Sequence, residues 1–221
     1  PWPRRPRALV ARLRETAAAD WRAKVGGVAL VGPEAARPYA DALRANLGFI
    51  LAARRGPALR PGARSYDRAW SRDAAMMADA LVRTGRRDAA RDFAAWYAPY
   101  LYDDGKTPCC VDARGADPVP ENDADGEFVH LVAAYVRASG DVAFGARMWP
   151  SVAAAAGHID ALRARRRGPE WRSGAKEAFF GLLPESISHE GYSEKPMHSF
   201  WDDAWGRRGL ADAAELAGRL G

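Results

Sequence analysis

The chain has 221 residues, of which 48% are hydrophobic, and carries 33 basic against 28 acidic residues, a net charge of +5. This composition is typical of a globular protein with a substantial core, and abundant Ala and Arg with few strand-favouring runs favour helix. The basic residues are dispersed and do not form stripes with aromatic residues, so no nucleic-acid partner is predicted. No apolar run approaches the roughly 20 residues of a membrane span, so no membrane partner is predicted either.

The start of the chain, from Pro1 to Arg14, is basic and interrupted by prolines. It lacks the apolar segment and small-residue cleavage site of a signal peptide. A start without Met, and an end directly after an alanine-rich helix, suggest a processed or truncated chain. The sequence leaves the compartment and the oligomeric state open.

Apolar residues recur at helical spacing within residues 43–51, 76–81 and 128–135. The spacing i, i+3, i+4 predicts amphipathic helices there, and we expect helix rather than sheet through 74–83 and 128–137. The predicted fold class is therefore all-α.

Three glycines follow apolar helical patterns, and each is followed within three residues by an Asp: Gly85 with Asp88, Gly140 with Asp141, and Gly209 with Asp212. Glycine supplies a left-handed helix C-cap and aspartate an N-cap for the next helix. The pattern predicts three tightly turned helical hairpins. Their long connections, Leu101 to Asp125 and Gly168 to His198, are expected to converge on one face and to carry a site.

Cys109 and Cys110 are adjacent in the sequence. Neighbouring side chains point apart, which would strain a bond between them, so no disulfide is predicted.

The densest group of candidate residues is Tyr66, Asp67, Trp70, Arg72 and Asp73, at the start of a predicted helix. Aromatic faces stack on sugar rings, and a fixed Arg and Asp can bind neighbouring hydroxyls as donor and acceptor. The structural alternative is that Ser71 or Asp73 caps the helix while Trp70 packs in the core.

A second group comprises the carboxylates Glu121, Asp123, Asp125 and Glu127. The helix dipole favours acidic residues at a helix start, which accounts for some of them, while Asp123 remains a candidate for a pocket. A calcium loop is a rival interpretation, but the twelve-residue pattern ending in a bidentate Glu is missing.

The third group combines carboxylates, histidines and aromatic residues: Glu185, His189, Glu190, Tyr192, Glu194, His198, Trp201, Asp202, Asp203 and Trp205. A carboxyl pressed against apolar rings has its pKa raised towards the value that a general acid needs. Zinc bound by His189 and His198 lacks the usual HExxH or cysteine ligands, so no metal is predicted. No phosphate-binding glycine loop and no GxSxG elbow is present.

These residues resemble those of the six-hairpin glycosidases, which include the glucoamylases and trehalases. The resemblance covers residues 41–221 and implies an (α/α)6 toroid of helical hairpins, of which about half would be present. Residues 1–40 resemble the linker and approach helix that lead to the ring in family members.

The resemblance also implies roles for single residues. Trp70, Arg72 and Asp73 match the motif that grips the sugar at the cleavage subsite. In the family the general acid directly follows a tryptophan, so the resemblance implies Asp202, which follows Trp201, as the acid and Asp203 as the second candidate. The acid is Glu in glucoamylases and Asp in trehalases. The catalytic base would lie in a later hairpin. The residues expected to bind substrate are Tyr66, Trp70, Arg72, Asp73, Asp123, Glu185, His198 and Trp201.

The predicted function is hydrolysis of a glycosidic bond with inversion, in which one carboxylic acid protonates the leaving oxygen and a carboxylate about 6.5–9.5 Å away activates water. The expected partner is a carbohydrate, and no cofactor is needed. Two alternatives stay open. A polysaccharide lyase on a related toroid could use His189, Tyr192 or His198 to abstract a proton, and a non-catalytic fragment could bind glycans without cleaving them.

Overall fold

A computed structural model of the chain describes residues 6–187 and 195–221, apart from the side chain of Ser65. Most of the described residues are helical, and one small sheet accompanies them, in agreement with the predicted all-α class. Contacts divide the chain into two compact units, Pro1–Ala52 and Ala53–Gly221. Each unit is described by itself below.

The first unit consists of α1 (Pro6–Val25), a short 3-10 turn at Glu34–Ala36, and most of α2 (Arg37–Ala53). Arg44 of α2 donates from Nε to the carbonyl oxygen of Val28 at 3.0 Å, which ties the connection to the helix. The boundary expected between residues 40 and 41 falls inside α2.

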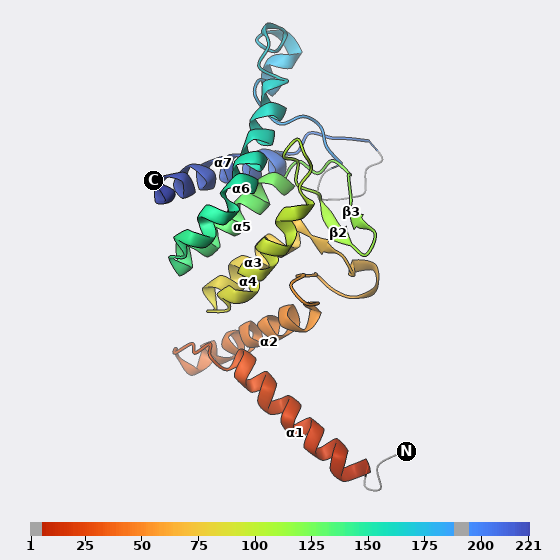
Figure 1. The fold of residues 1–221 in the computed structure, drawn as a ribbon, viewed down its shortest axis with the longest axis vertical. Helices are drawn as coiled ribbons and strands as arrows, with labels where there is room; N and C mark the ends of the chain where they lie inside the picture. Colours follow the sequence, from red (N-terminus) through yellow and green to blue (C-terminus); the bar gives the residue numbers. More distant parts are fainter. Residues whose placement is uncertain (1–5, 188–194) are drawn as a thin grey trace. The chain divides into compact units, whose positions relative to one another are not determined.

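The second unit is built around α5, which contacts the four other helices of the unit (Figure 1). Its side chains are buried on nearly all sides, which explains why its sequence is apolar around most of the helix. Among the described residues of this unit, the α-helices that pack together are α3 (Ser71–Arg83), α4 (Arg87–Tyr97), α5 (Ala124–Ser139), α6 (Val142–Ala164) and α7 (Phe200–Leu220). The helices expected over 74–83 and 128–137 are therefore confirmed.

The turn between α3 and α4 is formed at Gly85, as predicted. Gly85 has a φ of +81°, and Arg86 donates its backbone N–H to the carbonyl of Leu81 at 2.7 Å. This is the hydrogen bond of a Schellman motif, which requires a left-handed residue at the glycine position. Asp88 does not cap α4; it lies within the first turn, where the helix dipole favours a negative charge.

The turn between α5 and α6 is also confirmed. Gly140 is left-handed, with a φ of +73°, and Asp141 Oδ1 accepts the backbone N–H of Phe144 at 2.9 Å. Here the predicted glycine C-cap and aspartate N-cap both form.

The third predicted turn, at Gly209, is wrong, because Gly209 lies inside the continuous helix α7. A Cβ on Gly209 would come within 2.6 Å of the Cα of Gly126 in α5. Glycine is needed here because two helices approach closely. Close packing and left-handed helix ends both favour glycine, so the residue alone does not tell them apart. Asp212 is likewise no cap: it is buried within α7 and pairs with Arg137 at 2.6 Å and His130 at 2.7 Å.

A small antiparallel sheet links the start of α3 to the loop that precedes α5. It consists of β1 (Ala69–Trp70), β2 (Cys110–Asp112) and β3 (Gly115–Ala116), and Trp70 pairs with Cys110. Ser71 extends the connection by donating its backbone N–H to the carbonyl of Cys109 at 3.0 Å. The sheet therefore brings the loop before α5 to the first turn of α3.

The loops before α5 and α7 are joined to each other. Asn122 Nδ2 donates to the carbonyl of Pro184 at 2.9 Å, and the N–H of Ile187 donates to the carbonyl of Pro120 at 2.9 Å. The connections expected to converge therefore meet.

Both cysteines are free thiols, as predicted. No helix within residues 6–187 and 195–221 has the length and apolarity of a membrane span.

Candidate functional site

Six side chains from the starts of three helices form a compact group in the second unit. We call it the three-helix cluster. Its members are Arg72 from α3, Glu121 from the loop before α5, Asp123 and Glu127 from the N-cap and first turn of α5, and Trp201 and Asp202 from α7. The sequence order of the helices places these residues far apart, and the joined loops bring them together.

Arg72 holds two carboxylates. Its Nη1 lies 2.8 Å from Glu121 Oε2 and 2.9 Å from Asp123 Oδ2, and all three side chains are largely buried. Burial raises the pKa of Glu121, and the charge of Arg72 opposes that rise. Burial lowers the pKa of the Arg72 guanidinium, but the neighbouring carboxylates outweigh it and the pKa is raised. The cation is therefore permanent and fixed in place by two anions.

Asp123 is the common partner of α3 and α7. Its Oδ2 accepts both from Arg72 Nη1 and from Trp201 Nε1, the latter at 2.8 Å, and the residue is completely buried. Trp201 and Trp205 meet edge to face with ring centroids 6.0 Å apart. The position of Trp201 is thus set by a charge-assisted hydrogen bond on one side and by an aromatic contact on the other.

Asp202 lies in the first turn of α7 and is only 1% exposed. Its Oδ2 accepts from Ser186 Oγ at 2.6 Å. Burial raises the pKa of Asp202 to about 7; the hydrogen bond from Ser186 lowers it, and the charge of Asp123 adds to the rise. Such a carboxyl is partly protonated near neutral pH, as a general acid must be.

Asp203, the predicted reserve for the acid, points elsewhere. Its Oδ1 accepts the backbone N–H of Leu183 at 2.8 Å, so this carboxylate holds the loop before α7. Adjacent helical residues project about 100° apart, which explains why Asp202 and Asp203 have different surroundings.

The predicted sugar-gripping residues on α3 lie at the edge of the three-helix cluster. Asp73 is half-buried, and burial raises its pKa while Arg72 opposes the rise. The ring of Trp70 is faced by the guanidinium of Arg68 at 5.3 Å and that of Arg72 at 6.0 Å. Tyr66 is 62% exposed in the 3-10 turn Arg64–Tyr66 and does not share the burial of the cluster.

Glu185 and His198 contact each other. His198 Nε2 lies 3.1 Å from Glu185 Oε1, Arg166 pairs with the same carboxylate, and Phe179 stacks on the imidazole with centroids 4.1 Å apart. These two predicted residues therefore belong to a separate ion-pair group next to Ser186. Four other candidates lie outside the described residues: His189, Glu190, Tyr192 and Glu194.

Several residues of the site were not singled out by the sequence. Ser186 carries no motif, and its role depends on the loop that brings it to Asp202. Glu127 was one of four acidic residues with no distinguishing feature, yet it is fully buried, and Ser71 Oγ donates to its Oε2 at 3.1 Å. Asp125 serves the fold instead: it accepts from the N–H of Thr107 and contacts His158 Nδ1, both at 2.7 Å.

One group among the described residues has the spacing of metal ligands, with Cys109, Cys110 and Asp117 offering ligand atoms within 4.8 Å of one another. Both oxygens of Asp117 already accept hydrogen bonds, Oδ2 from Arg68 at 2.6 Å and Oδ1 from the N–H of Val119 at 3.1 Å. A cation would compete with the guanidinium of Arg68 for that carboxylate, so we assign no metal to this group.

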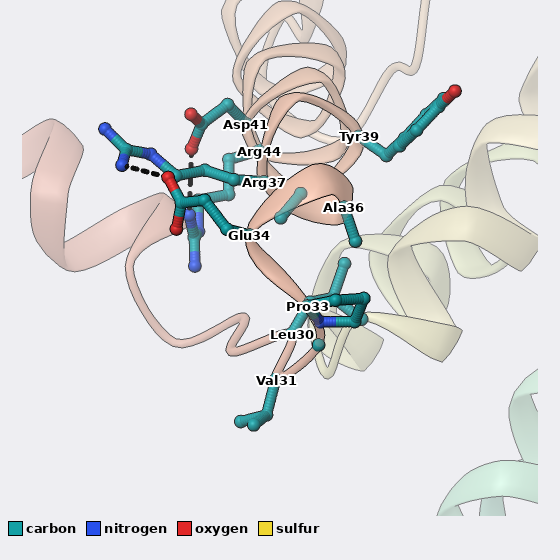
Figure 2. A pocket seen from close by; sticks show the side chains of 11 residues that line it. Leu30, Val31, Pro33, Glu34, Ala36, Arg37, Tyr39, Asp41 and Arg44 are labelled. Atoms are coloured by element: carbon teal, nitrogen blue, oxygen red, sulfur yellow. Dashed lines mark hydrogen bonds and ion pairs between the residues drawn. The ribbon is translucent and has the colours of Figure 1, made fainter.

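A pocket of about 540 Å³ lies within the first unit (Figure 2). Its charges are paired in the wall, Arg37 with Glu34 at 2.8 Å and Arg44 with Asp41 at 3.1 Å. None of the predicted site residues lines it. Its size alone therefore does not make it the site of the predicted chemistry.

Comparisons of the chain with protein-family models, with curated proteins and with solved structures found no match. The function is therefore argued from the geometry of the three-helix cluster.

Proposed function

We propose that the chain is a glycoside hydrolase whose hairpins form part of an (α/α)6 toroid, with Asp202 as its general acid. The observation that supports this best is the connection of Arg72, Asp123 and Trp201, from three helix starts, next to a buried Asp202. An aromatic ring, a fixed cation and a fixed carboxylate are the groups that recognise a sugar by its C–H face and its hydroxyls.

The chemistry assigned to Asp202 is the protonation of the leaving group. As the glycosidic C–O bond breaks, Asp202 gives its proton to the leaving oxygen, and water adds to the anomeric carbon from the opposite face in an inverting reaction. A second carboxylate takes the proton of that water. The proposal assigns the acid alone and names no residue of this chain as the base.

The experiment compares the wild type with Asp202→Asn on a panel of oligosaccharides and polysaccharides. We expect the variant to fold and to bind the same glycan, while kcat falls by roughly 10²–10⁴-fold. The loss should be smaller with a glycosyl fluoride, because fluoride leaves without needing a proton. Asp79→Asn is the matched control: this carboxylate pairs with Arg83 on the surface of α3, and its loss should leave turnover unchanged.

Unchanged hydrolysis by Asp202→Asn would remove Asp202 from the role of acid. NMR of the first sugar released distinguishes inversion from retention, and an unsaturated product would identify a lyase. The near-complete burial of Asp202 favours one further candidate, a glycan-binding protein without turnover. Binding by the wild type and by Asp202→Asn with hydrolysis by neither would establish that candidate.

A further inference from the structure

Three buried carboxylate oxygens of the three-helix cluster have no hydrogen-bond partner among the described residues. They are Oδ1 of Asp123, Oε1 of Glu127 and Oδ1 of Asp202, and Asp123 and Glu127, which both belong to α5 or its N-cap, are 0% exposed. The other oxygen of each is satisfied: Asp123 Oδ2 accepts from Arg72 and Trp201, and Glu127 Oε2 is bonded to Ser71 Oγ. An unpaired buried acceptor is costly, so their occurrence in one cluster requires an explanation.

The two residues are positioned to meet. They are four apart in sequence, and the backbone N–H of Glu127 donates to the carbonyl of Asp123 at 3.1 Å, so both lie on one face of the first helical turn. Their carboxyl groups are within hydrogen-bonding reach of each other. Two ionised carboxylates cannot hydrogen-bond, because each is only an acceptor. One proton between them would satisfy both unpaired oxygens at once.

We propose that Glu127 is a neutral carboxylic acid that donates its proton to Asp123 Oδ1, and that it is the positioning residue which holds Asp123 against Arg72 and Trp201. The role in turnover rests on the proposed function. The shared proton does not, because it follows from the burial and pairing of these side chains.

The surroundings of Glu127 favour the neutral form. Burial raises its pKa well above the usual range, the charge of Asp123 adds to the rise, and Arg72 and Ser71 oppose it. Tyr97 reaches this region from α4 and is itself fully buried.

The remaining neighbours of α5 leave the assignment intact. From α7, Trp201 and Asp202 lie on the side of Asp123. From α6, His158 contacts Asp125, which is two residues from each member of the pair and so projects from another side of the helix. Among these neighbours, Arg72 is the cation next to the pair. It already forms ion pairs with Glu121 and Asp123, so its charge is balanced without an ionised Glu127.

Asp123 then has a donor on each oxygen, with Arg72 and Trp201 on Oδ2 and Glu127 on Oδ1. A carboxylate held from both sides cannot rotate, so the indole of Trp201 is fixed as well, and with it the start of α7 that carries Asp202. Glu127 acts on the acid through this chain of contacts and does not itself touch a substrate.

Infrared spectroscopy tests the proton directly. In an Asp202→Asn background, which removes a carboxyl whose pKa is raised to about 7, a protonated-carboxyl signal should persist at about pH 8. It should vanish in the double variant with Glu127→Gln and remain in the double variant with Glu121→Gln. No such signal at this pH, or a signal that survives Glu127→Gln, would overturn the proposal.

Stability gives a second readout that needs no activity. Glu127 keeps its proton in the folded chain and loses it on unfolding above its ordinary pKa of 4.5, so unfolding releases one proton. The ratio of wild-type to Glu127→Gln unfolding constants should therefore rise by roughly tenfold per pH unit as the pH increases above about 5. A ratio that does not change with pH would contradict the shared proton.

Turnover tests the positioning role. The amide of Glu127→Gln can still donate to Asp123 Oδ1, so this variant should retain kcat, whereas Glu127→Met leaves that oxygen unpaired and should lose about tenfold or more. Equal kcat values for the Gln and Met variants would refute the positioning role. If the chain cleaves no glycan at all, the proposed function fails, while the infrared and stability results still decide the shared proton.

Discussion

The indole nitrogen of Trp201 donates to Asp123 Oδ2 at 2.8 Å, a hydrogen bond between residues 78 positions apart in the sequence. The same oxygen accepts from Arg72 Nη1 at 2.9 Å. One carboxylate oxygen therefore joins the starts of α3, α5 and α7. Because Trp201 directly precedes Asp202, the pairing of Asp123 also determines where the candidate acid lies.

Replacing the indole tests this connection. Trp201→Phe keeps an aromatic ring but removes the donor, so the free energy of unfolding should fall by about 1.5–3 kcal/mol, the contribution of a hydrogen bond to a charged group. Urea denaturation measures the change. The same substitution at Trp171, whose ring faces the guanidinium of Arg166 at 4.9 Å, keeps its main contact and should cost less. Equal losses at the two positions would mean that the bond to Asp123 contributes little.

Removing the cation of the cluster should cost more. Arg72→Met leaves Glu121 and Asp123 buried without their shared partner, and breaking such a pair typically destabilises by about 3–5 kcal/mol. Thermal and urea unfolding should both show the loss, and glycan binding should disappear with it. Arg83→Met is the surface control: Arg83 is exposed and pairs with Asp79 one turn away in its own helix, so its loss should change stability little.

The sequence indicated the residue types of the site better than their connections. Trp70, Arg72 and Asp73 could be identified because a motif and a helix start coincide. The joining of Asp123 to Trp201, and of Ser186 to Asp202, could not be predicted, because it depends on how two long loops fold against each other. Local patterns carry no information about such contacts.

The close approach of α5 and α7 gives a prediction about the fold. Gly209→Ala places a Cβ only 2.6 Å from the Cα of Gly126, so the helices must separate and stability should fall by about 1–3 kcal/mol. Helix propensity alone predicts the opposite, a gain of up to about 1 kcal/mol. Gly218→Ala, in the same helix with nothing within 4 Å of the new Cβ, should show that gain. A gain at both positions would contradict the helix packing described above.

The three glycines predicted to end helices show what sequence analysis of the fold cannot distinguish. At Gly85 and Gly140 the glycine has a positive φ, and the rule for helix ends holds. At Gly209 the rule fails because glycine also allows close helix packing. Asp212 pairs with Arg137 and does not cap a helix. The two uses of glycine are identical in sequence and differ only in the tertiary structure.

The raised pKa of Asp202 makes a prediction about stability and pH. In the unfolded chain the carboxyl titrates near its ordinary value of 3.8, and in the folded chain near 7. Between these values the folded state holds a proton that the unfolded state has lost, so the contribution of this group to stability is greatest below pH 4 and declines as the pH rises towards 7. The full difference corresponds to about 4 kcal/mol, taken as an upper limit.

Asp202→Asn removes this titration. Urea unfolding measured across this range should show the wild type losing stability relative to the variant between about pH 4 and pH 7, with the difference constant at higher pH. Glu215→Gln is a control of opposite sign: hydrogen bonding to Arg137 lowers the pKa of Glu215, so its contribution is present above pH 4.5 and is lost only as the pH falls further. If the difference between the wild type and Asp202→Asn does not change from pH 4 to pH 7, Asp202 titrates normally in the folded chain. The carboxyl would then be ionised near neutral pH and could not serve as the general acid.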